Sequence, residues 1–297
     1  MNPIDAIHIH FSQDNLLFLN ICLAFIMFSI ALDIRRSDFE MLLAHPKPAV
    51  IGMISQLILM PLMTLALVFI CQPPPSVALG MIAISACPGG NNSNYSTHLA
   101  RGNTALAITT TSLSVIICIV TMPLYIWCGA KLIPNLPILE KEVQLNPFDM
   151  FKIVGLLILV PLIIGMFLRE KRPIFTSKIE KPFKIISLIL FFTLIIGALA
   201  ANFKNIWEYV GKVFFIVALL NGLALAIGYY FSKINGLPEA DRRAITFETG
   251  IHNITLALII IFNFFDGLGG MALVAAWYGI WDLITGFGLA MYWGKKK

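Results

Sequence analysis

Long apolar runs alternate with short polar ones along almost the whole chain. Nine of these runs approach or exceed the roughly 20 residues that a helix needs to cross the hydrocarbon of a bilayer. They show no period-two alternation, which excludes a membrane barrel. We place the predicted spans at 15–34, 48–71, 76–101, 103–128, 148–168, 183–202, 206–231, 239–265 and 267–293. The pattern predicts an all-α polytopic membrane protein with nine transmembrane helices.

Two of the predicted spans are interrupted by residues that resist helix formation. The third is broken at 88–94, where Pro88, Gly89 and Gly90 stand together, and the eighth is broken at 250–253. Each broken span is followed by one more span, and the two lie five spans apart, so they run through the membrane in opposite directions. This arrangement predicts an inverted repeat with two discontinuous crossing helices and a binding site at the breaks.

The charged residues define the orientation of the chain. Only 12% of positions are charged, against about a quarter in soluble domains. With the N-terminus outside and the C-terminus in the cytoplasm, 16 of the 21 basic residues face the cytoplasm, as the positive-inside rule favours. We therefore expect a multi-pass protein of the cell membrane. The same asymmetry explains the net charge of +5 without a nucleic-acid partner.

Glu248 is the residue around which the predicted site is organised. It lies in the middle of the eighth span, where an ionisable group costs roughly 2.5–3.5 kcal/mol on insertion scales and is usually functional. The apolar spans contain no midplane Lys or Arg to pair with it. Either the carboxyl is protonated or a cation is bound.

Oxygen-bearing groups accompany Glu248 at the two breaks. Hard cations such as sodium prefer carboxylate, carbonyl, amide and hydroxyl oxygens. The helices that restart at about Asn94 and at Asn253 would also direct their N-terminal amides into the cavity and favour an anion. The predicted cation ligands are Gln56, Ser93, Asn94, Thr111, Glu248 and the freed carbonyls of Thr249 and Ile251.

Three other interpretations compete with this one. A proline and glycine kink could have a purely structural role, and the hydroxyl of Thr111 could serve helix packing. Glu248 and His252 could form a proton relay, which would give a proton-coupled anion transporter. Their i, i+4 spacing could also suit a transition metal in an intramembrane metalloenzyme, although two ligands are too few and Gly250 interrupts the helix between them.

Several motifs resemble the bile acid:sodium symporter family over nearly the whole chain. They are the run 85–94 followed by 100–103, the run 247–250 with Asn253, Gln56, and the run 281–286. The nine predicted spans are similar to the branch of animal sodium/bile acid cotransporters. The resemblance implies that the protein is a secondary active transporter and not an enzyme, importing an organic anion such as a bile acid or a similar carboxylate or sulfonate with two sodium ions.

The resemblance also implies residue roles. Sodium site 1 would comprise Ser93, Asn94, Thr111 and Glu248. Sodium site 2 would comprise Gln56, Glu248, Thr249, Ile251 and His252. Asn91, Asn94 and Asn253 would bind the substrate. Ala107 stands where the family has a hydroxyl and His252 where it has a glutamine, so the sodium stoichiometry depends on two altered positions.

The resemblance further implies two moving parts within one transmembrane unit that spans 1–297. A core domain would comprise about 48–128 and 206–294, and a panel domain about 12–40 and 148–202. The expected partners are the organic anion, the sodium ions and the lipid bilayer.

Overall fold

The computed structural model describes residues 3–6, 20–21, 24–29, 31–32, 40, 46–133, 147–201 and 203–295. The regular elements named in these ranges are helices. They are η1 (Pro3–Ala6), α3 (Pro46–Ile54), the π-helical turn η2 (Ser55–Leu59), α4 (Met60–Cys71), α5 (Pro75–Ser85), α6 (Asn91–Leu99), α7 (Thr104–Leu132), α9 (Pro147–Lys171), α10 (Pro173–Ala201), α11 (Phe203–Ile234), α12 (Glu239–Gly250), α13 (Ile254–Phe264) and α14 (Gly269–Lys295).

Five helical stretches of this part of the chain are long and apolar enough to cross a membrane. They are Pro46–Cys71, Thr104–Leu132, Phe148–Lys171, Val213–Ile234 and Gly269–Lys295. The all-helical, multi-pass membrane class is thereby confirmed. The count of nine spans and the inverted repeat stay predictions, since half of the first predicted span lies outside the described residues.

Both predicted interruptions are present. The third span divides into α5 and α6, and the eighth into α12 and α13. We expected the first of these to restart at about Asn94, but α6 begins at Asn91. The Ser93 N–H already donates to the Gly90 carbonyl at 3.0 Å, so the first turn closes as soon as the glycine pair has passed.

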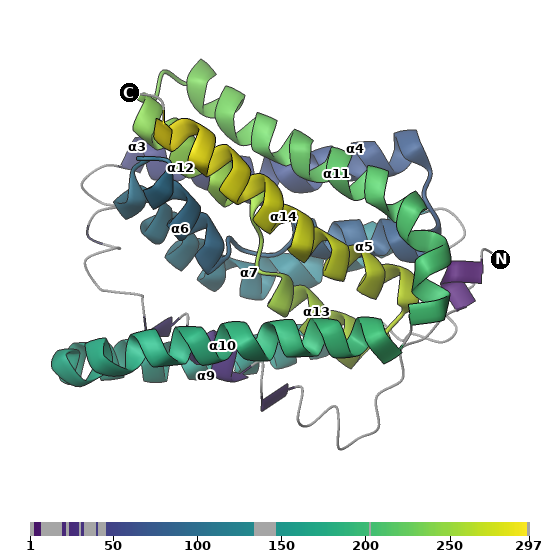
Figure 1. Cartoon of the computed structure of the whole chain (residues 1–297), viewed down its shortest axis with the longest axis horizontal. Helices are drawn as coiled ribbons and strands as arrows, with labels where there is room; N and C mark the ends of the chain where they lie inside the picture. Colours follow the sequence, from purple (N-terminus) through teal and green to yellow (C-terminus); the bar gives the residue numbers. More distant parts are fainter. Residues whose placement is uncertain are drawn as a thin grey trace.

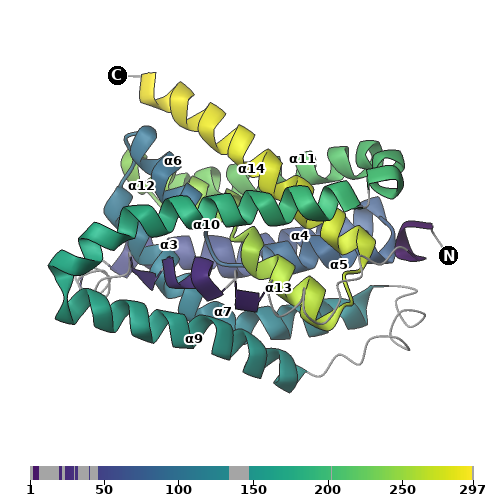
Figure 2. The same ribbon diagram turned by 60° about the horizontal axis from the view of Figure 1, so that its bottom comes forward.

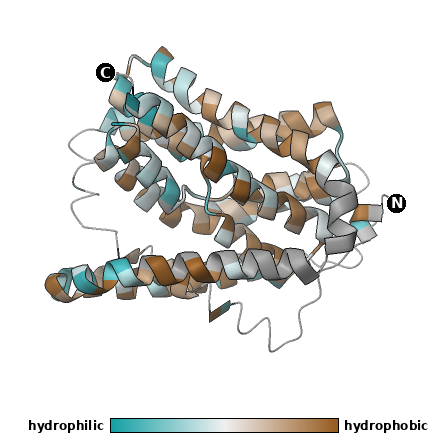
Figure 3. Ribbon diagram, in the orientation of Figure 1, coloured by the Kyte–Doolittle hydropathy of each residue, from teal (hydrophilic) through white to brown (hydrophobic). Residues whose placement is uncertain are grey.

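The halves of the broken helices are sorted by polarity. Figures 1 and 2 show α6 and α12 on the side of the C-terminus and α5 and α13 further toward the other end. Figure 3 shows the more hydrophilic residues gathered on the side of α6 and α12. α14 packs against the polar halves α6 and α12 and against the apolar halves α5 and α13. It lies so close to α5 that a Cβ added at Gly80 would be 2.9 Å from the Cα of Met271.

Helices α9 and α10 form a hairpin along one side of the molecule (Figure 1). The sequence predicted a loop between 168 and 183, but α10 begins ten residues earlier, at Pro173. Proline is well suited to the first turn of a helix. The Thr176 hydroxyl donates to the Leu168 carbonyl at 3.0 Å, and Arg169 pairs with Glu180 at 2.8 Å, so the polar stretch is fixed as helix.

Candidate functional site

The two breaks are hydrogen-bonded to each other. Gly89 and His252 form an antiparallel bridge. The Asn253 N–H donates to the Pro88 carbonyl at 2.9 Å, and the Gly90 N–H donates to the Ile251 carbonyl at 3.3 Å. Backbone groups freed inside a membrane must be satisfied within the protein, and here each break satisfies the other. The Ile251 carbonyl, which we expected to be free, is therefore already an acceptor.

Close approach of the two chains requires the glycine pair. A Cβ at Gly90 would lie 3.1 Å from the His252 carbonyl oxygen. A Cβ at Gly89 would collide with Oε2 of Glu248. The sequence 88–90 thus ends α5 and also leaves room for the second break and its carboxylate.

The second break is fixed mainly by neighbouring helices. The Gly250 carbonyl at the end of α12 accepts from Nδ2 of Asn221 at 2.9 Å and from the hydroxyl of Tyr278 at 3.0 Å. Asn253 then caps α13 by accepting the Leu256 N–H at 3.3 Å. Helices α11 and α14 thereby hold the point at which the eighth span divides.

Glu248 is completely buried at this crossing. The Ser93 hydroxyl donates to its Oε1, and the Thr111 hydroxyl lies 2.9 Å from both of its carboxylate oxygens. The polar partners of the carboxylate thus come from the start of α6 and the middle of α7. The structure thus brings together Ser93, Thr111 and Glu248, three of the predicted cation ligands.

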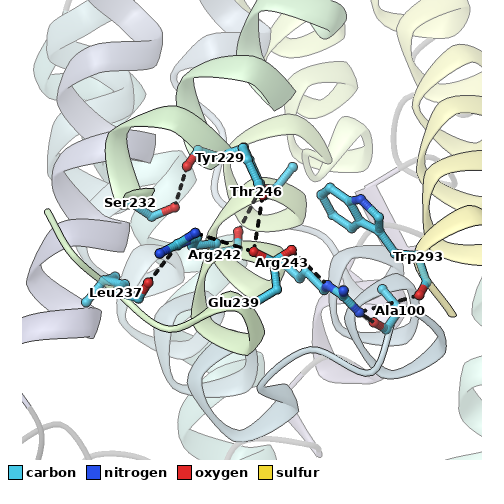
Figure 4. Close-up of polar contacts among 9 residues, drawn as sticks. All are labelled: Ala100, Tyr229, Ser232, Leu237, Glu239, Arg242, Arg243, Thr246 and Trp293. Carbon is cyan, nitrogen blue, oxygen red and sulfur yellow. Dashed lines mark hydrogen bonds and ion pairs between the residues drawn. The ribbon is translucent and has the colours of Figure 1, made fainter. Parts of the chain in front are cut away.

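The arginines nearest to Glu248 in sequence bond elsewhere, at the N-terminal end of α12. Figure 4 shows Arg243 reaching the Ala100 carbonyl, at 2.7 Å, and pairing with Glu239 at 3.2 Å. Arg242 donates to the Leu237 carbonyl at 2.6 Å. Glu248 is not a member of the ion pairs formed among the described residues.

The surroundings of Glu248 contain more acceptors than protons. Besides its two carboxylate oxygens, the bonded set contains the hydroxyls of Ser93 and Thr111, which also contact the carbonyls of Gly90 and Ala107. Asn94 Oδ1 lies 3.4 Å from the Thr111 hydroxyl. The Gly90 carbonyl also accepts the Ser93 N–H, and the Ala107 carbonyl belongs to the backbone of α7. The five side-chain oxygens of Glu248, Ser93, Thr111 and Asn94 therefore share two hydroxyl protons. A cation would satisfy such a set.

Gln56 lies near the same carboxylate. It lies in the π-helical turn η2, and π turns inside helices are frequent at functional sites. Its side chain is completely buried, and neither Oε1 nor Nε2 has a hydrogen-bond partner. A Cβ added at Gly89 would lie 3.5 Å from this Nε2 and would collide with Oε2 of Glu248. Gln56 therefore lies beside the crossing.

Adjacent to Gln56, the Ser55 hydroxyl bonds the Thr249 hydroxyl at 2.8 Å. This contact joins η2 to α12 one residue after Glu248. A role for Ser55 could not be recognised from the sequence, since a serine in an apolar helix is usually a packing residue.

His252 does not bond Glu248. Its Nδ1 lies 3.3 Å from the Tyr278 hydroxyl, whereas Nε2 is buried without a partner. A direct relay between the two side chains is thus not formed. Within the described part of the chain, no three His, Cys, Asp or Glu residues are grouped as metal ligands would be.

Sequence reasoning overlooked three buried polar residues near the second break. Asp282, on α14, is 2% exposed and lies close to the His252 backbone amide. Asn221 and Tyr278 hold the Gly250 carbonyl. An acid or amide in a membrane span is a signal that could have found Asp282 and Asn221. Asp282 is thus a second buried acid near the crossing, where the sequence analysis considered only Glu248.

The three residues predicted to bind the substrate differ in their surroundings. Asn253 is 6% exposed, and its Nδ2 has no partner. Asn94 borders the oxygen cluster. Asn91 is the first residue of α6, but its side chain lies outside the described part of the structure.

The fold and the site define a multi-pass membrane protein with two broken helices crossing at a buried carboxylate. Residues 20–209 match the model of the Sodium Bile acid symporter family. The chain belongs to this family. It is a membrane transporter and not an enzyme, and sodium is the ion to which its family couples transport.

Individual relatives are similar over most of the chain. The "Uncharacterized sodium-dependent transporter YocS" of Bacillus subtilis is 30% identical over 94% of this chain and 84% of its own length. The "Probable sodium/metabolite cotransporter BASS2, chloroplastic" of Oryza sativa subsp. japonica is 27% identical over 92% of this chain and 63% of its own. The human "P3 protein" is 28% identical over 85% of this chain and 52% of its own. The matches thus span less than two thirds of the rice and human proteins.

Proposed function

We propose that the protein is a sodium-coupled symporter that imports an organic anion by alternating access. The observation that carries the proposal is the excess of oxygen acceptors around the buried Glu248, because the five side-chain oxygens of Glu248, Ser93, Thr111 and Asn94 share two hydroxyl protons. A sodium ion prefers such ligands and neutralises the carboxylate without a basic residue.

Two sodium ions fit the arrangement of polar groups. The first would be held by Ser93, Asn94, Thr111 and Glu248, which already contact one another. The second would be held on the other side of the carboxylate by Gln56, Glu248, His252 and the carbonyls of Thr249 and Ile251. The unpartnered side-chain atoms of Gln56 and His252 support this second position.

An anion would bind next to the cations. The N-terminal ends of α6 and α13 each behave as roughly half a positive charge and face the crossing. Asn253 offers an unpartnered N–H donor at the start of α13, and Asn91 and Asn94 stand at the start of α6. We infer that the substrate is a bile acid or a similar carboxylate or sulfonate. Such an anion is compatible with the name of the rice relative, a probable sodium/metabolite cotransporter.

Charge accounting couples the two ligands. One carboxylate and two sodium ions leave one net positive charge in a low-dielectric site, and an anion cancels it. Sodium and substrate therefore raise each other's affinity by the same factor.

This accounting requires Asp282 to be neutral when the ligands are bound. The uncharged, nearly isosteric substitution Asp282→Asn is therefore expected to preserve sodium-dependent uptake within about fivefold, because a change of one hydrogen-bonding atom costs about 0.5–1.5 kcal/mol. Uptake by proteoliposomes containing the variant measures this. Loss of sodium dependence would show that Asp282 supplies a required charge.

The moving parts would be the core at about 48–128 and 206–294 and the panel at about 12–40 and 148–202. Polar contacts unite the halves of the core at one end. The Asn103 side chain donates to Asp241 at 2.8 Å, and Arg243 bonds the Ala100 carbonyl. These ties support a core that rocks as one body. The N-terminus of the chain would lie outside the cell and its C-terminus in the cytoplasm.

The test measures sodium and substrate together. The melting temperature of the purified protein in detergent is followed in NaCl or choline chloride of equal ionic strength, at fixed pH, with a panel of carboxylates and sulfonates. We expect stabilisation by sodium and a further increase with a carried anion. If uptake proceeds equally in choline at the same pH and follows the proton gradient, the coupling ion is the proton and not sodium.

A further inference from the structure

The hydroxyl of Tyr278 lies between two groups of the second break. The side chain is completely buried. Its oxygen is 3.0 Å from the Gly250 carbonyl and 3.3 Å from Nδ1 of His252. A carbonyl can only accept a hydrogen bond, and a phenol has a single proton to give.

This geometry assigns the tautomer of His252. The phenol proton goes to the Gly250 carbonyl, which is the nearer acceptor and cannot donate in return. The phenol oxygen then accepts from the imidazole, so the proton of the neutral ring is on Nδ1. The lone pair is consequently on Nε2, which is buried and has no partner.

The bridge between the breaks indicates where the ring projects. Directly opposed residues of an antiparallel pair send their side chains to the same face. His252 opposes Gly89, and the Cβ direction of Gly89 leads to Glu248 and to Nε2 of Gln56. The ring of His252 therefore leaves the chain on the face that carries Glu248 and Gln56.

We propose that Tyr278 is a positioning residue that holds His252 as the Nδ1–H tautomer and so presents the Nε2 lone pair to the second cation. This rests on the proposed function, and it names the ligand atom and the residue that orients it. Histidine ligands are commonly oriented by a hydrogen bond from their other ring nitrogen, and loss of that bond typically lowers cation affinity about 10- to 100-fold.

A glutamine at position 252 would behave differently, because an amide oxygen accepts a cation without a choice of tautomer. Sodium also prefers oxygen to nitrogen. We therefore expect His252→Gln to bind sodium at least as tightly as the wild type. In that background the hydroxyl of Tyr278 should no longer affect sodium binding.

The experiment is a double-mutant cycle on purified protein, with NaCl as the ligand and the melting temperature as the readout. Choline chloride keeps the ionic strength constant. Tyr278→Phe should raise the NaCl concentration for half-maximal stabilisation about tenfold in the wild-type background and less than about twofold in His252→Gln. A tenfold rise in both backgrounds would mean that the hydroxyl acts only by supporting the Gly250 carbonyl, and would overturn the proposal.

A second measurement requires no Tyr278 variant. The chain has five histidines. ¹⁵N spectra of histidine-labelled protein, assigned by the signal lost in His252→Gln, report which ring nitrogen carries the proton. A protonated Nδ1 supports the proposal, and a protonated Nε2 refutes it. If the melting temperature of the wild-type protein does not depend on NaCl, the proposed function itself is refuted. Failure of the Tyr278 proposal can therefore be distinguished from failure of the proposed function.

Discussion

The two breaks at the crossing arise in different ways. The first contains Pro88, Gly89 and Gly90, residues that end a helix through their own backbone chemistry. The second contains no proline, and its course depends on other helices. Asn221 and Tyr278 hold the Gly250 carbonyl, and the first break accepts the Asn253 N–H.

The two breaks also differ in the chemical groups that they carry. The first supplies neutral amides and hydroxyls at the start of α6, whereas the second carries Glu248 and His252. A locally encoded break can serve as a rigid frame, because its shape does not depend on its ligands. A break held by tertiary contacts can respond to a bound ion. We expect substitutions at the second break and its supports to affect sodium binding more than those at the first, unless they reach Glu248.

The largest expected effect comes from removing the charge of the second break. Glu248→Ala should abolish sodium-dependent uptake while the protein still inserts, because the shared ligand of both cation positions is lost. Uptake into proteoliposomes measures this, and size-exclusion chromatography monitors folding. Full sodium-dependent uptake by this variant would end the account of Glu248 as a cation ligand.

Gly89→Ala tests where the first break reaches the second. The added Cβ would collide with Oε2 of Glu248 and lie 3.1 Å from its Cδ. Overpacking costs about 1–3 kcal/mol, so sodium affinity should fall roughly 10- to 100-fold. The measurement is the NaCl dependence of the melting temperature.

The matched control is Gly288→Ala in α14, where nothing lies within 4 Å of an added Cβ. It should leave sodium affinity unchanged. Equal behaviour of the two variants would show that contact with the carboxylate is unimportant.

Asn221→Ala releases one support of the second break. The substitution removes one donor to the Gly250 carbonyl, which keeps the Tyr278 hydroxyl, and it also leaves the Thr285 hydroxyl without its acceptor and a cavity where the amide stood. Together these losses cost about 1–3 kcal/mol, and we expect sodium affinity to fall on the order of tenfold. NaCl titrations of thermal stability measure the change. Thr285→Val, which removes only the hydroxyl bonded to Asn221 Oδ1 at 2.7 Å, should have a smaller effect.

Pro88→Ala should have the smallest effect. The Pro88 carbonyl that accepts from Asn253 is retained, and the two glycines still interrupt the helix. Proline substitutions at compatible positions change free energies by about 0.4–1 kcal/mol, so sodium affinity should stay within about fivefold of the wild type. A loss as large as that of Asn221→Ala would show that the first break is no more autonomous than the second.

Much of the site could be predicted from the sequence. An acidic residue in an apolar span is energetically costly and therefore rare, and this identified Glu248 as a functional residue. Proline and glycine identified the first break. The start of α10 was predicted too late in the chain, because hydrophobicity alone does not distinguish a polar helix from a polar loop. Here Thr176 and Glu180 stabilise the polar helix through tertiary contacts.

The sequence by itself determined the membrane class, the two interruptions and the carboxylate between them, because each follows from the cost of placing polar or helix-breaking groups in hydrocarbon. Only the tertiary structure decided that the breaks hydrogen-bond each other, that Ser93 and Thr111 meet Glu248, and that Tyr278 faces His252. These contacts join residues far apart in the chain, and their geometry depends on how whole helices pack.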